Sequence, residues 1–174
     1  EIQVWLEFRR VLFRSRTFTE QGEFSKAEET ADFLTKEKLN KLNAKNLLLE
    51  KAYLYQTQSD FNKMVQNLTL ADSLLTSTDR KSRIYFIVGQ VYQKLGFGAE
   101  AFDYYKKCLS ANPEYEIDFY ARLNMAQVAR IDDQQNARNI RKQFMQMLKD
   151  EKNIEFKDKI YFEIGEDRKS TRLN

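Results

Sequence analysis

The sequence predicts an all-α fold, an α-solenoid in which antiparallel helical hairpins stack one after another. Its 174 residues include one proline and five glycines, which is too few for a β-rich chain with many tight turns. Hydrophobic residues make up 42% and charged residues 32%, a balance typical of helices that each bury one stripe. A short motif also recurs along the chain, at a spacing that suits paired helices. Together these observations favour repeated helical hairpins.

The recurring motif is Ile-Tyr-Phe-x-(Val/Ile)-Gly, found at residues 84–89 and again at residues 160–165. The copies lie 76 residues apart, which is two units of the length seen in helical-repeat proteins, roughly 33 to 47 residues. We therefore expect two helices in each unit. The predicted helices lie near residues 23–35, 43–57, 61–75, 81–95, 99–110, 116–130, 136–149 and 155–166.

The clearest unit spans residues 82–116 and shows why its two helices can approach closely. Gly89 in the first helix and Ala101 in the second have little or no side chain, so the two backbones can come together. Tyr92 and Tyr105 are placed to fill the space beside them. We therefore assign these four residues to the packing between the helices.

The same unit contains the residues that end its helices. Gly96 supplies the turn between the two helices, and Pro113 ends the second helix because proline has no backbone N–H to donate. Val88 and Cys108 complete the packing face. A reactive thiol is the alternative role for Cys108, but its position calls for a small buried residue, and cysteine behaves as one.

Weaker copies of the unit occur in register on both sides. Each is recognised by small or aromatic residues at equivalent positions. These packing residues are Gly22, Ala27, Ala31 and Leu34; Ala52, Tyr55, Met64, Leu68 and Ala71; Ala126, Ala129, Ile140, Phe144 and Met147; and Ile164 and Gly165. We expect the last copy to consist of its first helix alone.

Both termini resemble translated sequencing adapter. The oligonucleotide GATCGGAAGAGCACACGTCTGAAC encodes residues 167–174, and its reverse complement, read from TTC with one further T, encodes residues 8–15. We therefore expect an adapter-derived artefact at residues 1–15 and 167–174, and a natural repeat domain at residues 16–166 that is a fragment of a longer protein. The two ends carry the whole net charge of +3, so the basic composition indicates neither nucleic acid nor a membrane surface as a partner.

The sequence offers no constellation for catalysis. It contains no histidine, which removes the commonest general base and the commonest zinc ligand. Its single cysteine excludes an internal disulfide and a thiolate cluster. The adjacent carboxylates Glu28-Glu29 and Asp132-Asp133 are expected on a solvated helix face and in a turn, because neighbouring helix residues do not face each other. We therefore predict no catalytic residue, no cofactor, no metal site and no enzyme activity.

Residues 82–116 resemble the tetratricopeptide repeat (TPR) position by position. Val88 and Gly89 lie where that family has Leu-Gly, Gly96 lies at its turn and Pro113 at its closing proline. The resemblance implies a TPR-like superhelix that serves as a scaffold for protein–protein interaction. It implies protein or peptide partners, and neither nucleic acid nor a small-molecule substrate.

A closer resemblance rests on residues 84–93, 112–126, 149–153 and 158–162. Their order is similar to that of the periplasmic TPR lipoproteins of the type IX secretion and gliding-motility system of Bacteroidota (PorW/SprE-type). That resemblance implies a periplasmic protein that binds other secretion components and is held at the outer membrane only through a lipid anchor, which this fragment lacks. The alternatives are a generic TPR adaptor with another partner, cytoplasmic or periplasmic, and a regulatory or sensor TPR segment of a longer signalling enzyme.

The first helices of stacked hairpins line the concave face, where ligands of such proteins usually bind. Aromatic rings and amides on that face suit a peptide, since rings supply contact area and amides pair with backbone. Several of these aromatics have packing between repeats as their alternative role. The expected protein-binding groove consists of Leu49, Tyr53, Gln56, Phe86, Gln90, Gln93, Leu123, Asn124, Gln127, Arg130, Phe162 and Glu166.

Overall fold

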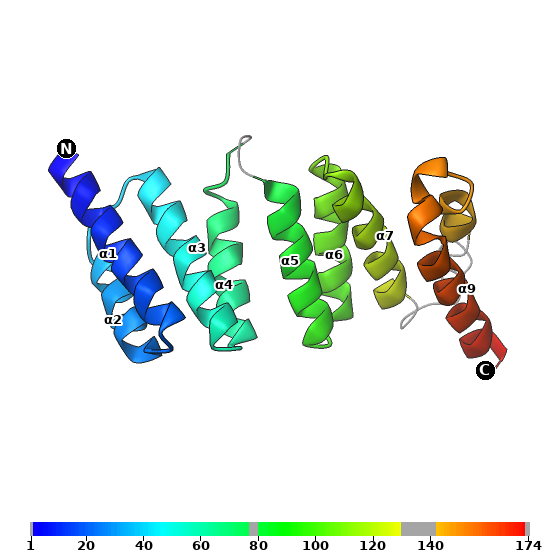
Figure 1. The fold of residues 1–174 in the computed structure, drawn as a ribbon, viewed down its shortest axis with the longest axis horizontal. Coiled ribbons are helices and arrows are strands. Elements are labelled where there is room, and N and C mark those ends of the chain that lie inside the picture. Colours follow the sequence, from blue (N-terminus) through cyan, green and yellow to red (C-terminus); the bar gives the residue numbers. More distant parts are fainter. Residues whose placement is uncertain (1, 77–79, 130–141, 173–174) are drawn as a thin grey trace. The chain divides into compact units, whose positions relative to one another are not determined.

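The computed structural model describes residues 2–76, 80–129 and 142–172, and the side chains of residues 6–165 within these ranges. The described part is built from helices and contains no strand, so the all-α prediction is confirmed. Consecutive helices pair into antiparallel hairpins (Figure 1). The chain divides into two compact units, Glu1–Ile84 and Tyr85–Asn174, with the boundary inside α5 (Lys81–Lys94).

The first unit contains two helical hairpins. α1 (Ile2–Glu20) packs against α2 (Phe24–Thr35), and α3 (Lys41–Thr57) packs against α4 (Phe61–Asp72). The two hairpins contact each other through α2 and α3 and through α1 and α3. This is the arrangement expected when each hairpin buries its apolar face against the next one.

Local sequence sets the ends of these helices. Gly22 connects α1 to α2 with a φ of +75°, a conformation that glycine adopts without steric cost. At the start of α3 the Asn40 side chain accepts a hydrogen bond from the backbone N–H of Asn43 at 2.8 Å. Asp60 does the same for the N–H of Lys63 at 3.1 Å, at the start of α4. Each side chain satisfies a donor that the first turn of a helix leaves without a partner.

α1 runs without interruption across the predicted boundary at residue 15. Phe8 is 4% exposed and packs in a core cluster that includes Leu47. The buried hydroxyl of Ser15 donates to the carbonyl oxygen of Ala27 at 2.9 Å. From their sequence we expect residues 1–15 either to pack as a poor substitute for a first helix or to be loose, and α1 takes the first-helix position of the first hairpin. The assignment of both termini to adapter stays a prediction.

The second unit continues α5 through a turn at Gly96, which has a φ of +84°. The elements that follow are α6 (Gly98–Ser110), α7 (Tyr115–Ala129), the helical residues 142–147, the 3-10 helix η1 (Glu151–Phe156) and α9 (Lys157–Arg172). One core cluster contains Ala101, Tyr105, Cys108, Ala121 and Val128. A second contains Phe119, Leu123, Ala126, Ala129, Phe144, Ile160 and Ile164.

Two predicted helices differ from those observed, and a third is only partly described. The helix predicted over residues 61–75 ends at Asp72. The helix predicted from residue 155 begins at Lys157 and is preceded by η1. η1 forms there because the side chain of Asp150 accepts a hydrogen bond from the backbone N–H of Lys152 at 3.0 Å and so caps a new helix. Of the helix predicted over residues 136–149, residues 136–141 lie outside the described residues, and residues 142–147 are helical.

Candidate protein-binding surface

The predicted groove residues divide between the two units. On α3, Leu49 and Tyr53 are half-buried and Gln56 is exposed. On α5, Gln90 is exposed, and the remaining predicted positions of this helix and of α7 are half-buried or buried. Arg130 lies outside the described residues, and the side chain of Glu166 is not described either.

In the first unit the ring of Tyr53 is covered by an arginine. Arg16 donates from Nε and Nη2 to the two carboxylate oxygens of Glu50, at 2.8 and 2.7 Å. Its guanidinium carbon lies 4.0 Å from the centre of the Tyr53 ring, a distance at which a cation and an aromatic face attract. The hydrogen bond to Glu50 raises the pKa of Arg16. One face of Tyr53 is therefore already occupied, and Arg16 belongs to any surface that Tyr53 forms.

In the second unit the predicted amides form a directed chain of hydrogen bonds. The hydroxyl of Tyr105 donates to Oε1 of Gln93 at 2.6 Å. Nε2 of Gln93 donates to Oε1 of Gln127 at 3.1 Å, and Nε2 of Gln127 donates to Oε1 of Glu163 at 2.6 Å. The chain joins α6, α5, α7 and α9 in that order. An amide has two N–H donors, and one donor of each glutamine is used in the chain.

The contact between consecutive first helices recurs in both units. Arg16 and Gln127 occupy the same repeat position, three 37-residue units apart. Each donates to a buried carboxylate on the next first helix, Arg16 to Glu50 and Gln127 to Glu163, and both acceptors are 6% exposed. Each acid lies two residues before the small residue of its own helix. That spacing is a signal in the sequence that could have identified Glu50 and Glu163.

One equivalent position of the repeat has three different environments. Leu123 is 6% exposed and belongs to the core of the second unit, so it is a core residue and not a groove residue. Phe86 is half-buried, packs against the core of α6 and α7, and has its ring 5.9 Å from that of Tyr105. Phe162 is 65% exposed. The covering of each ring or side chain by the neighbouring helices, and not the repeat position, explains the difference.

Most residues assigned to packing are buried. The close approach at Gly89 is real, because a Cβ built there would lie 2.7 Å from Cε1 of Tyr105. Tyr92 and Pro113 are half-buried, and Gly22 and Gly96 are exposed in turns. The buried members are Ala27, Ala31, Leu34, Ala52, Tyr55, Met64, Leu68, Ala71, Val88, Gly89, Ala101, Tyr105, Cys108, Ala126, Ala129, Phe144 and Ile164.

Gly165 differs from the expectation that it is a packing glycine like Gly89. A Cβ built on Gly165 would meet no atom within 4 Å. The reason is that Tyr105 of α6 lies against Gly89, whereas no described atom lies within 4 Å of the equivalent point on α9.

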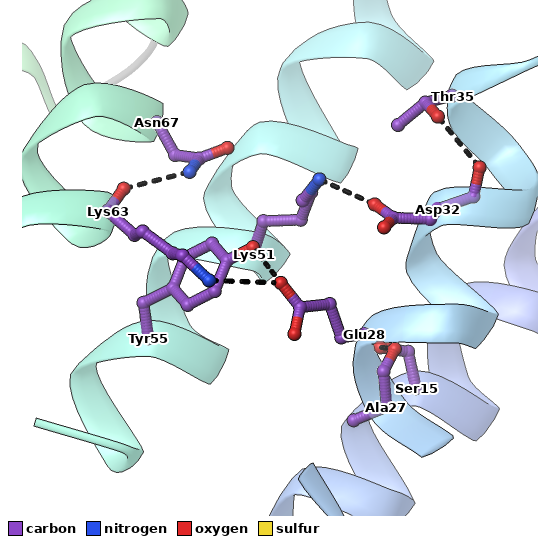
Figure 2. A network of polar contacts seen from close by, with 9 residues as sticks. All are labelled: Ser15, Ala27, Glu28, Asp32, Thr35, Lys51, Tyr55, Lys63 and Asn67. Carbon is purple, nitrogen blue, oxygen red and sulfur yellow. Dashed lines mark hydrogen bonds and ion pairs between the residues drawn. The ribbon is translucent and has the colours of Figure 1, made fainter. Parts of the chain in front are cut away.

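The carboxylate of Glu28, which we expect from its sequence context on a solvated face, is instead the centre of a polar network in the first unit (Figure 2). Oε1 of Glu28 accepts from the hydroxyl of Tyr55 at 2.7 Å and from Nζ of Lys63 at 3.3 Å. Lys51 forms an ion pair with Asp32 at 2.7 Å nearby. Burial, followed by the bond to Glu28, raises the pKa of Tyr55. The network links α2, α3 and α4, so its role is structural. Its ion pairs are partly exposed, and each therefore contributes only about 0–1 kcal/mol to stability.

Cys108 is fully buried, and burial, with the nearby charge of Asp118, raises the pKa of its thiol to about 11. The thiol is therefore neutral near neutral pH. Because only the thiolate is a nucleophile, Cys108 acts as a packing group and not as a reactive one.

Within residues 2–76, 80–129 and 142–172 no cluster of three potential metal ligands occurs. No helix in those ranges has the length and apolarity needed to cross a membrane.

Comparison with known proteins gives one family match. No curated protein matches the chain. Residues 82–115 match the family model of the tetratricopeptide repeat, and this segment is the α5–α6 hairpin with its Gly89–Tyr105 contact. Such repeats are typically modules of protein–protein interaction and not of catalysis. The α5–α6 hairpin is thus similar to the tetratricopeptide repeat.

Proposed function

We propose that this chain is a non-enzymatic protein-binding scaffold, and that it is a segment of a type IX secretion and gliding-motility lipoprotein that binds other secretion components in the periplasm of Bacteroidota. The observation that carries the scaffold function is the tetratricopeptide match over residues 82–115. The support for the secretion role is the resemblance of residues 84–93 and 112–126 to that lipoprotein family. The location at the outer membrane rests on the same resemblance.

The second unit has both hydrogen-bonded side chains, held in one position, and an exposed side chain that can adjust to a partner. The chain from Tyr105 through Gln93 to Gln127 holds the two amides in place. Fixed side chains lose less conformational freedom when a ligand binds, which favours affinity. Gln90 is exposed on the same helix as Gln93 and can adapt to a peptide backbone. We expect the partner to lie along α5 and α7 and to contact Gln90.

The test compares two exposed glutamines that differ only in the helix that carries them. Gln90→Arg changes a first helix, and Gln66→Arg makes the same change on the second helix α4. Exposed helix positions tolerate such changes within about 0.5 kcal/mol, so both variants should keep the wild-type melting temperature. Each 174-residue chain is immobilised and exposed, in parallel, to solubilised envelope and to cytosol from a gliding member of the Bacteroidota.

Wild type and Gln66→Arg should capture the same secretion components, and Gln90→Arg should capture about tenfold less, the equivalent of about 1.4 kcal/mol. Equal capture by all three chains would place the binding surface elsewhere. Selective capture of cytosolic proteins would contradict the secretion role and leave the scaffold function standing.

A further inference from the structure

The second unit contains a cavity of about 260 Å³ between the first half of α7 and residues 143–153. No residue predicted for the groove lines it. Small-molecule sites usually have volumes of roughly 300–1,000 Å³, so this cavity is small for a cofactor and large enough for one long side chain. Its lining residues are Tyr115, Asp118, Phe119, Arg122, Gln143, Gln146, Met147, Asp150 and Asn153.

Helical spacing builds both walls of the cavity. On α7 the lining residues are three or four positions apart, and residues so spaced share one helix face. The opposite wall is tied down by Asn153, which is 5% exposed and donates from Nδ2 to the carbonyl oxygen of Met147 at 2.7 Å. The hydroxyl of Tyr115 donates to the side-chain oxygen of Asn153. These bonds join the two walls.

The base of the cavity is apolar and its rim is polar. Phe119 is 1% exposed, and its ring stacks on that of Phe156 at 4.4 Å. Met147 is half-buried beside it. Gln143 and Gln146 are exposed at the rim and carry amide oxygens that can accept hydrogen bonds. An apolar base with acceptors at the mouth fits a side chain that has a hydrocarbon stem and a polar head.

The charges of the lining leave one carboxylate without a counterion. Asp118 accepts two hydrogen bonds from Arg122, at 2.8 and 2.9 Å, so these two charges neutralise each other. Asp150 accepts a backbone hydrogen bond from Lys152. Within the ranges that the structure describes, no lysine or arginine lies within ion-pair distance of Asp150. The lining therefore has a net charge of −1.

We propose that this cavity binds an arginine side chain of a partner polypeptide. Its methylene stem would lie over Phe119 and Met147, and its guanidinium would meet the carboxylate of Asp150 and the rim amides. Arginine fits better than lysine because its planar head has five N–H donors for several acceptors, whereas an ammonium group is compact and strongly hydrated. The proposal does not depend on the secretion role, because it follows from the cavity alone.

The first experiment uses small probes and the full chain. N-acetyl-arginine methylamide is titrated into the ¹⁵N-labelled protein, with the citrulline, lysine and glutamate derivatives as comparisons. We expect the arginine derivative to shift amide resonances of the lining residues and the citrulline derivative, its neutral counterpart, to bind about fivefold more weakly, the scale of one solvent-accessible ion pair. Equal binding of the arginine and citrulline derivatives overturns the proposal, and equal binding of lysine overturns its assignment to arginine.

The second experiment changes the charge of the lining in both directions. Asp150→Asn removes the charge but keeps a side-chain oxygen for the cap on Lys152, because asparagine caps helices as well as aspartate does. It should weaken arginine binding about fivefold. Arg122→Gln releases Asp118 and should strengthen binding. The control Asp103→Asn, at an exposed position of α6 outside the cavity, should change nothing.

The two changes are expected to alter arginine binding in opposite directions, so misfolding cannot produce the expected result. A variant that only destabilises the unit would bind arginine more weakly, whichever of the two residues is changed. Weakening by both changes, or by neither, overturns the proposal.

Discussion

The two copies of the Tyr-Phe-x-(Val/Ile)-Gly sequence, in α5 and α9, have nearly the same residues and different surroundings. In α5 the face is covered by α6: the Tyr85 ring lies 6.3 Å from that of Tyr104, and a Cβ on Gly89 would collide with Tyr105. In α9 the equivalent Tyr161 is 61% exposed, and the space at Gly165 is open. The comparison teaches that a repeat position has no fixed environment. The neighbouring helix decides whether the residue there is core or surface.

The largest expected difference between the two copies is at their glycines. Gly89→Leu should lower the free energy of unfolding by about 1–3 kcal/mol, because the new side chain overpacks the contact with Tyr105. Gly165→Leu should raise it by up to about 1 kcal/mol, because leucine is the better helix former and no atom lies nearby. Urea denaturation followed by circular dichroism measures both. Losses of equal size would show that the face of α9 is covered in solution.

The phenylalanines of the two copies give a smaller contrast. Phe86→Ala should cost about 2 kcal/mol, below the range of about 3–5 kcal/mol for a fully buried phenylalanine, because the ring is half-buried against the core. Phe162→Ala should change stability by about 0.5 kcal/mol or less, since that ring is 65% exposed. The same denaturation measurement applies. An equal loss for both would mean that exposure does not distinguish the two copies.

Local sequence predicts the parts of this molecule that depend on single residues. The turn at Gly96 and the small-residue contact between Gly89 and Tyr105 both follow from residue type and spacing. The short helix η1 does not follow from residue type and spacing. Its cap at Asp150 starts a separate short helix directly before α9, where the sequence pattern indicates only one helix.

The polar contacts between first helices are harder to predict. Arg16 and Glu50 are 34 residues apart, and Gln127 and Glu163 are 36 apart. Their pairing depends on how neighbouring hairpins stack and on which rotamers reach across, and neither follows from residue type. The burial of Leu123 does not follow from the sequence for the same reason: repeat position indicates which helix face a residue is on, but not what covers that face.

The core cluster of α6 and α7 contains a titratable group, Cys108, that gives the last and smallest expected effect. Burial raises the pKa of Cys108 from 9.0 to about 11, so between these values the unfolded chain has lost a proton that the folded chain retains. The unfolded state then binds fewer protons, and stability must fall as pH rises. Between pH 9 and pH 10 the expected loss is about 1 kcal/mol. Tyr55 and Tyr105 have pKa values that burial also raises, from an ordinary value of 10.0. Together they add a further loss of roughly 0.7 kcal/mol between pH 9 and pH 10, and more above it.

Denaturation at pH 7, 9 and 10 under reducing conditions checks this effect. Cys108→Ala should lose about 1 kcal/mol less than the wild type between pH 9 and pH 10. Cys108→Ala combined with Tyr161→Cys should behave like Cys108→Ala, because Tyr161 is 61% exposed and a thiol in water has the same pKa folded and unfolded. The double variant should instead react rapidly with a thiol reagent at pH 8, while Cys108 in the wild type reacts only as fast as the hairpin opens. Equal losses in Cys108→Ala and the wild type between pH 9 and pH 10 would assign the whole effect to other groups and show that burial does not raise the pKa of Cys108.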